Sequence, residues 1–312
     1  MIVALGDYMM DLSLQVEATA LRGTHSFAQA QVSPGGSAAN FAVWSARLGA
    51  KVGLIARVGD DILGRALLQD LQQEGVVSGV AVGKETTGLT VALVEQGDQP
   101  SSVAASPHLP TPVQPTMWVA RGATSGLSVD DLDWKLLDRA TLLHVTAYSF
   151  FEKTTSQAAL AAINYVRKRG GLISLDPSLA GYLRRIGSAA FFALVGGADL
   201  FFPNLDEGRA LTAEQEPERV LHALLQRFPI VALKMGAAGA MAGMGDRTLH
   251  HPGFSVPVVD RMGAGDAFAA AFVVSWLAHR DLAAALEEGN RIAAGVVQVA
   301  GARNAKAILP LS

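Results

Sequence analysis

Residues near the C-terminal end of the chain combine the features of an anion site with an acid. Gly263, Ala264 and Gly265 form a turn before an apolar, helix-favouring run, and Asp266 lies where that helix is expected to begin. The N-terminus of a helix has unpaired backbone N–H groups and partial positive charge, so it attracts anions. A carboxylate beside such a site can take the proton from a hydroxyl that attacks a bound phosphate. The pattern therefore indicates phosphoryl transfer.

A second candidate site precedes an expected helix in the N-terminal third. Gly35 and Gly36 let the backbone approach a ligand, and Asn40 lies one helical turn further on, where it can face the same ligand. Ser37 is expected to cap the helix over residues 38–48. A turn followed by a capped helix would also explain the two glycines.

Charged side chains after two other expected strands are candidates for contacting the same ligand. Asp7 and Asp11 follow the first strand, over residues 2–6. Paired carboxylates can accept hydrogen bonds from vicinal hydroxyls, although acids after a strand are often turn formers. We expect one of the two in a substrate site and favour Asp11. Arg121 ends a later strand and either reaches the substrate or lies on the surface.

Two segments of the C-terminal half are candidates for binding a nucleotide. Asn204 and Glu207 are spaced as a capping box at a helix N-terminus, and hard oxygen ligands of this kind also suit Mg²⁺. Both roles can hold together. Lys234 ends a strand that enters a loop with Gly236 and Gly239, but the loop lacks the Gly-Lys-Ser/Thr ending of a P-loop.

Together these segments resemble the ribokinase-like (PfkB) carbohydrate kinase family. Its C-terminal signature, Asp-Thr-x-Gly-Ala-Gly-Asp, is similar to residues 260–266, with Arg261 in place of Thr. Its N-terminal signature, a glycine pair and an Asn followed by Ala-Arg-Leu-Gly, is similar to residues 35–49, and its Asn-x-x-Glu motif matches Asn204 and Glu207. These motifs occur in family order and span almost the whole chain.

The resemblance implies an ATP-dependent kinase with an assigned role for each motif. Asp266 would be the general base, and the amides of Gly263, Ala264 and Gly265 would form the anion hole. The substrate would contact Asp7, Asp11, Gly35, Gly36, Asn40 and Arg121. ATP would contact Asn204, Lys234, Gly236, Gly239 and Asn290, and Glu207 with Asn204 would hold Mg²⁺ through water. A monovalent cation such as K⁺ near the carbonyls of residues 260–262 is a further, weaker expectation.

Two positions depart from the family pattern. Arg261 is expected to point to solvent, with a contact to phosphate as the alternative. Ser178 replaces the Asn of a family turn, Asp-Pro-Asn, that lies between substrate and nucleotide. Neither change touches the expected base.

The elements that position these motifs alternate between strand and helix. From residue 142 onward the alternation is regular, and it predicts a doubly wound, mostly parallel sheet in a three-layer α/β/α sandwich, with ligands at the carboxyl ends of the strands. Strands within about residues 8–34 and 86–123 are expected to form a small β-sheet lid, and residues 96–114 a loop. Short strands are expected around Thr248 and Val256, and Val258 and Val259 should end a strand. We expect one domain over residues 1–312.

Composition excludes several other classes of protein. The 312 residues carry a formal charge of −3 without a basic stripe, so nucleic-acid binding has no electrostatic support. The chain contains no cysteine, which rules out disulfides and thiolate chemistry. The N-terminus lacks the pattern of a signal peptide, and the longest apolar helix expected is too short to cross a bilayer. We expect a cytoplasmic protein that binds no membrane. A homodimer formed through the lid is an open alternative to a monomer.

Several substrates and functions remain open from sequence. Ser33 and Ser37 flank the glycine pair where a sugar phosphate would need Lys or Arg, so a free sugar or sugar acid is favoured. A nucleoside kinase is the alternative, with its base slot formed by Phe150, Phe151 or Trp118. A non-catalytic sugar-binding sensor is a third reading. A nicotinamide dehydrogenase is disfavoured because no Gly-x-Gly-x-x-Gly follows the first strand.

Overall fold

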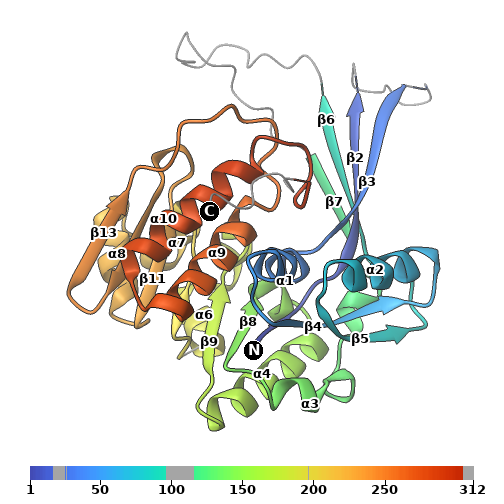
Figure 1. Ribbon diagram of the computed structural model, residues 1–312, viewed down its shortest axis with the longest axis horizontal. Coiled ribbons are helices and arrows are strands. Elements are labelled where there is room, and N and C mark those ends of the chain that lie inside the picture. Colours follow the sequence, from blue (N-terminus) through green and yellow to red (C-terminus); the bar gives the residue numbers. More distant parts are fainter. Residues whose placement is uncertain (17–24, 26, 96–115, 196, 305–312) are drawn as a thin grey trace.

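The computed structural model describes residues 1–16, 25, 27–95, 116–195 and 197–304, and its centre is a nine-stranded sheet (Figure 1). The strand order is β13 (Arg247–His251), β12 (Ala240–Met244), β11 (Ile230–Lys234), β10 (Leu200–Phe201), β9 (Leu172–Asp176), β8 (Leu142–Thr146), β1 (Ile2–Leu5), β4 (Val52–Gly59) and β5 (Val77–Gly83). The strands from β11 to β5 pair in parallel, and β12 and β13 add an antiparallel hairpin at one edge.

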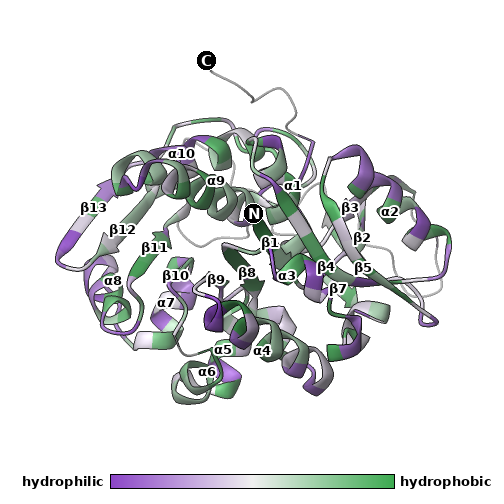
Figure 2. Cartoon of the chain, turned by 60° about the horizontal axis from the view of Figure 1, so that its bottom comes forward, coloured by the Kyte–Doolittle hydropathy of each residue, from purple (hydrophilic) through white to green (hydrophobic). Residues whose placement is uncertain are grey.

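Helices cover both faces of this sheet, each over its own apolar core (Figure 2). One face carries α1 (Ser37–Arg47), α2 (Ile62–Gln73), α9 (Ala264–His279) and α10 (Leu282–Val296). The other carries α3 (Trp134–Leu137), α4 (Lys153–Lys168), α5 (Ala180–Ile186), α6 (Ser188–Val195), α7 (Leu205–Thr212) and α8 (Pro217–Leu225). Successive strand residues alternate between the cores, as Val3 and Ala4 do. The predicted doubly wound α/β/α sandwich is thereby confirmed.

A separate four-stranded sheet projects beside α1 and α2 (Figure 1). Its order is β3 (Ala28–Gly35), β2 (Met9–Val16), β6 (Leu89–Glu95) and β7 (Thr116–Ala120). We call it the lid sheet. Its strand β3 ends at Gly35, and α1 of the sandwich begins at Ser37. The glycine pair expected to contact the substrate therefore connects the lid sheet to the sandwich.

The parallel strands bring chemistry-bearing residues to one edge of the sheet. Asp7 follows β1, Tyr148 follows β8, Asp176 ends β9, and Lys234 ends β11. The carboxyl ends of parallel strands lie at the same edge, where doubly wound folds bind ligands. The order of the strands therefore spreads these side chains along one line above the sheet.

Several expected elements differ from those observed. Residues 252–261 form no strand, so the strands expected around Val256 and at Val258 and Val259 are wrong. The β12–β13 hairpin already forms the edge of the sheet, and the Val259 amide donates instead to the Val297 carbonyl at 2.7 Å. The N-cap of α1 is Gly36, with φ of 92°, and not Ser37. The expected loop over residues 96–114 lies outside the described residues. In the described part of the chain, no helix has the length and apolar character needed to span a membrane.

Candidate active site

Asp266 lies in the first turn of α9 and is held from α1. Its Oδ1 accepts a hydrogen bond from the Ser37 hydroxyl at 2.6 Å, and its Oδ2 accepts one from Asn40 Nδ2 at 2.9 Å. Burial raises the pKa of Asp266 to about 6, and the two hydrogen bonds oppose that rise. The carboxyl is therefore ionised at neutral pH while remaining a stronger base than an ordinary aspartate. The structure thus joins the first two predicted motifs around one carboxylate.

A lysine–carboxylate group lies on the other side of the α9 turn. Lys234 Nζ is 2.6 Å from Asp176 Oδ2, and a Cβ built on Gly265 would lie 3.3 Å from the same Nζ. Burial lowers the pKa of Lys234, but the charges of Asp176 and Glu207 outweigh burial and raise it. The ammonium is therefore a fixed positive charge beside the turn predicted to bind phosphate.

Asn204 and Glu207 form the capping box that their spacing predicts. The Asn204 amide donates to Glu207 Oε2 at 2.8 Å, and the Glu207 amide donates to Asn204 Oδ1 at 2.9 Å. Burial, followed by the charge of Asp176, raises the pKa of Glu207 to about 7. One oxygen of each side chain is thus committed to the helix end, which leaves the other Glu207 oxygen as the remaining acceptor.

These residues fit Mg²⁺ only as outer ligands. Among the described residues there is no cluster of three or more His, Cys, Asp or Glu side chains that could hold a metal by itself. Mg²⁺ usually keeps several waters and binds through one or two carboxylates together with substrate phosphates. The nearby carboxylates of Glu207 and Asp176 suit an ion of that kind.

A second ion pair lies on the substrate side. Arg121 Nη2 is 3.0 Å from Asp7 Oδ1 and donates to the Tyr148 carbonyl at 3.0 Å. Burial raises the pKa of Asp7, and Arg121 opposes that rise. Arg121 Nε and Nη1 are buried and have no hydrogen-bond partner within the described part of the chain. Arg121 is therefore not a surface arginine, and two of its nitrogen atoms are buried without an acceptor among the described residues.

The glycine pair is needed for close packing between the lid sheet and β1. A Cβ on Gly36 would collide with the Asp7 carbonyl oxygen, and its φ of 92° also favours glycine. A Cβ on Gly35 would occupy the space of the Asp11 carboxylate. Burial raises the pKa of Asp11 to about 6, and a hydrogen bond from Thr90 opposes that rise. Both predicted acids thus lie against the glycine pair.

The remaining predicted residues vary in their surroundings. Gly236, with φ of 62°, faces open space, whereas Gly239 is packed against the His251 carbonyl and serves the turn between β11 and β12. Asn290 on α10 is buried and donates to the Leu286 carbonyl of its own helix at 3.1 Å. Arg261 is exposed, as expected. Roles for these residues in nucleotide binding stay predictions.

The sequence did not predict the roles of three side chains at the site. Ser37 is not the helix cap that the sequence predicts, and its hydroxyl donates instead to Asp266. Tyr148 is close enough to Asp7, Asp266 and Asp176 for their charges to raise the pKa of its hydroxyl, after the larger effect of burial. Arg303 donates to Asn40 and to the Gly35 carbonyl from the far end of the chain. A positively charged residue therefore does lie beside the glycine pair, although no sequence neighbour supplies one.

Known proteins match this chain over nearly its whole length. The model of the pfkB family carbohydrate kinases matches residues 1–308. The ATP-dependent ribose-1-phosphate kinase of Halopiger xanaduensis is 31% identical over 306 residues, which are 97% of this chain and 94% of that protein. The 2-dehydro-3-deoxygluconokinase of Bacillus subtilis is 31% identical over 289 residues, 89% of this chain and 85% of that protein.

Solved structures agree on the fold. The adenosine kinase of Sinorhizobium meliloti superposes with a TM-score of 0.84 at 21% identity, covering 100% of this chain and 96% of that one. An E. coli protein solved with ATP and Mg²⁺ superposes with a TM-score of 0.82 at 24% identity, covering 98% of this chain and 95% of that one. With the family model matched over almost the entire length, the chain belongs to the pfkB family of carbohydrate kinases.

Proposed function

We propose that this protein transfers the γ-phosphate of ATP to a hydroxyl of a small sugar or sugar acid, with Asp266 as the general base. The observation that carries the proposal is the position of the Asp266 carboxylate. It lies in the first turn of α9, between the Ser37 and Asn40 donors of α1 and the Lys234 ammonium beyond Gly265. A base, an anion-binding helix end and a fixed cation from β11 thus meet at the first turn of α9.

In the proposed reaction, Asp266 accepts the proton of the substrate hydroxyl as its oxygen attacks the γ-phosphorus and the bond to the leaving oxygen of ADP breaks. Ser37 and Asn40 hold the two carboxylate oxygens in place. The Ala264 amide donates to the Arg261 carbonyl at 3.3 Å, so Gly263 and Gly265 are the amides that we assign to the anion hole.

The nucleotide would lie along the ends of β9, β10 and β11. Lys234 supplies positive charge there, and the Gly236 turn lets the backbone approach phosphate. Mg²⁺ would be held through water by the Glu207 oxygen that the capping box leaves free, while Asn204 fixes the position of Glu207, and it would neutralise charge on the phosphates. A K⁺ ion near the carbonyls of residues 260–262 is a further proposal, to be tested by replacing K⁺ with Na⁺ in the assay.

The surroundings of Arg121 favour a substrate that carries an anionic group. Nε and Nη1 of Arg121 are buried and unsatisfied among the described residues, at a cost in free energy. We propose that the side chain turns on substrate binding, so that a carboxylate or phosphate on the sugar supplies their acceptors. Relatives are named for a sugar phosphate, for a sugar acid and for fructose, so the choice of an anionic substrate rests on Arg121. Ser33 and Ser37 do not exclude a sugar phosphate, because Arg121 supplies a positive charge beside Asp7 from elsewhere in the chain.

A nucleoside receives less support from the predicted base slot. Phe150 is buried in the core, Phe151 packs against Tyr182, and Trp118 is exposed on β7. A coupled ADP-release assay with ATP and Mg²⁺ over neutral sugars, sugar acids, sugar phosphates and nucleosides tests the proposal, with Asp266→Asn as the control. We expect turnover of sugars, with sugar acids or sugar phosphates preferred over neutral sugars. Turnover of nucleosides alone would overturn the choice of a sugar, and a preference for neutral sugars would overturn the choice of an anionic one.

Pairing of two copies through the lid sheet also remains a proposal. The residues Met117, Trp118 and Val119 of β7 and Val32 of β3 expose large apolar side chains to solvent. A second copy with the same apolar strands would cover them.

A further inference from the structure

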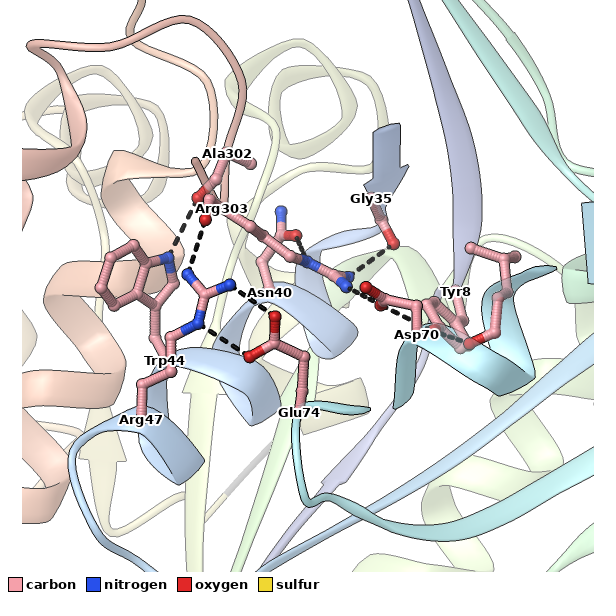
Figure 3. A network of polar contacts seen from close by, with 10 residues as sticks. Tyr8, Gly35, Asn40, Trp44, Arg47, Asp70, Glu74, Ala302 and Arg303 are labelled. Atoms are coloured by element: carbon pink, nitrogen blue, oxygen red, sulfur yellow. Dashed lines mark hydrogen bonds and ion pairs between the residues drawn. The ribbon is translucent and has the colours of Figure 1, made fainter. Parts of the chain in front are cut away.

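A buried arginine near the C-terminus lies directly behind the proposed active site. The Arg303 side chain is 6% exposed and uses all three nitrogen atoms of its guanidinium (Figure 3). Its Nε donates to Asn40 Oδ1 at 2.7 Å, its Nη2 to the Gly35 carbonyl at 3.1 Å, and its Nη1 to Asp70 Oδ2 at 2.8 Å. The guanidinium therefore joins the glycine pair, α1 and α2.

The chain around Arg303 is fixed on both sides. Trp44 Nε1 donates to the Ala302 carbonyl at 3.0 Å, and Arg47 Nη1 donates to the Arg303 carbonyl at 2.6 Å (Figure 3). A Cβ on Gly263 would collide with Ala302, so this segment also packs against the turn that precedes Asp266. The Tyr8 ring lies under the guanidinium, with its centroid 5.6 Å from Cζ. The arginine has little freedom to move.

This arrangement determines which end of the Asn40 amide faces Asp266. An arginine only donates hydrogen bonds, so it can be satisfied by the amide oxygen of Asn40 and not by the amide nitrogen. With Oδ1 turned to Arg303, Nδ2 must turn away, and it donates to Asp266 Oδ2 at 2.9 Å. A flipped amide would place its oxygen against the carboxylate and its NH₂ against a guanidinium, and both contacts would be repulsive.

We infer that Arg303 is a positioning residue for the proposed base, acting through Asn40 to keep a hydrogen-bond donor directed at the Asp266 carboxylate. The inference rests on the proposed role of Asp266. Without Arg303, the Asn40 amide is held by Asp266 alone, which weakens one of the two hydrogen bonds that oppose the rise of the Asp266 pKa.

The expected consequence is a shift in the pH dependence of the reaction. The other groups near Asp266 are Ser37 on α1, Lys234 on β11, Asp176 on β9 and Tyr148 after β8. None of them is among the hydrogen-bond partners of Arg303, so their effect on Asp266 stays the same when Arg303 is replaced. Replacing Arg303 therefore changes the contribution of Asn40 and removes one positive charge, a loss that also raises the pKa of Asp11.

The test is the acidic limb of kcat/KM against pH in Arg303→Met and Arg303→Lys. Weakening the hydrogen bond to the charged form of Asp266 should move the midpoint of the acidic limb up by about one pH unit. The value of kcat/KM should then fall roughly five-fold at pH 6 and by less than about two-fold at pH 8. A lysine cannot reach Asn40, Gly35 and Asp70 with one ammonium, so Arg303→Lys should shift the limb as well. Arg303→Lys carries the test if Arg303→Met fails to fold.

Controls separate positioning from loss of structure. Arg57 on β4 is another largely buried arginine, with Asp131 Oδ1 2.8 Å from its Nη1. Arg57→Met should lower the melting temperature without moving the acidic limb. In Asn40→Ala the donor is already absent, so adding Arg303→Met should shift the limb by clearly less than Arg303→Met does alone.

A limb unchanged in both Arg303 variants, an equal shift in Arg57→Met, or additive shifts with Asn40→Ala would overturn the inference. The Asp266→Asn variant separates the proposed role of Asp266 as base from the positioning role of Arg303. If that variant keeps near-wild-type turnover, the proposed function itself fails. If it is inactive while the Arg303 variants titrate like wild type, only the positioning role fails.

Discussion

The pair between Lys234 and Asp176 offers a quantitative test of the electrostatics at the site. Their side chains are 15% and 7% exposed and lie 2.6 Å apart, so replacing Lys234 by Met strands one buried carboxylate and removes the cation nearest to Glu207. Breaking a buried pair by removing one partner costs about 3–5 kcal/mol. Because this pair is not fully dry, we expect a loss of about 3 kcal/mol in the free energy of unfolding, or a fall in Tm of about 4–5 °C for a chain of 312 residues.

The loss in Lys234→Met should grow with pH. Folding raises the pKa of Glu207 to about 7. Its protonated form therefore contributes fully to the free energy of unfolding below the ordinary pKa of a glutamate, and this contribution is lost as the pH rises through 7. The charge of Lys234 lowers the pKa of Glu207, so that pKa rises further when Lys234 is removed. The variant should therefore be closer to wild type at pH 5 than at pH 8.

Urea unfolding at pH 5 and pH 8 measures both effects, with Lys135→Met as the matched control. Lys135 is an exposed lysine of α3, and its removal should change the free energy of unfolding by no more than about 0.5 kcal/mol. If Lys234→Met is as stable as Lys135→Met at pH 8, or is equally destabilised at both pH values, the reasoning about this buried pair is wrong.

Two further predictions concern the substrate and the lid sheet. Arg121→Met should raise KM for an anionic substrate by roughly 10–100-fold, as expected from the loss of a charged hydrogen bond, and Arg121→Lys, which keeps a charge near Asp7, should recover part of it. An equal effect on neutral and anionic sugars in steady-state assays would contradict this role. Trp118→Glu should shift the molar mass in light scattering from two chains to one, with Phe254→Glu, an exposed residue after β13, as control. A wild-type protein that is already a single chain at high concentration would refute the lid interface.

The sequence predicted those parts of the site that come from contiguous motifs. Asp266, Asn40 and Lys234 are each marked by the turn, helix start or strand end around them, and the structure brings all three together. Their proximity follows from the parallel sheet, because strand ends and helix starts meet at one edge.

The parts that escaped prediction depend on distant contacts or on backbone geometry. Arg303 meets Asn40 across 263 positions of sequence, and no local pattern marks that pairing. The error at Ser37 arose because Gly36 takes the N-cap with a positive φ, which moves Ser37 one position into the helix and frees its hydroxyl for Asp266. The strand expected at Val258 and Val259 was inferred from β-branched residues alone, whereas tertiary contacts decide such short segments.

The most direct test of the central claim is the turnover of Asp266→Asn. Asparagine fits the same space and can still contact Ser37, but it cannot accept a proton from the substrate. We predict that the variant binds ATP with a Kd within about two-fold of wild type in calorimetry while kcat falls by about 10²–10⁴-fold, the usual loss for a positioned base. A kcat close to that of wild type would show that Asp266 is not the general base.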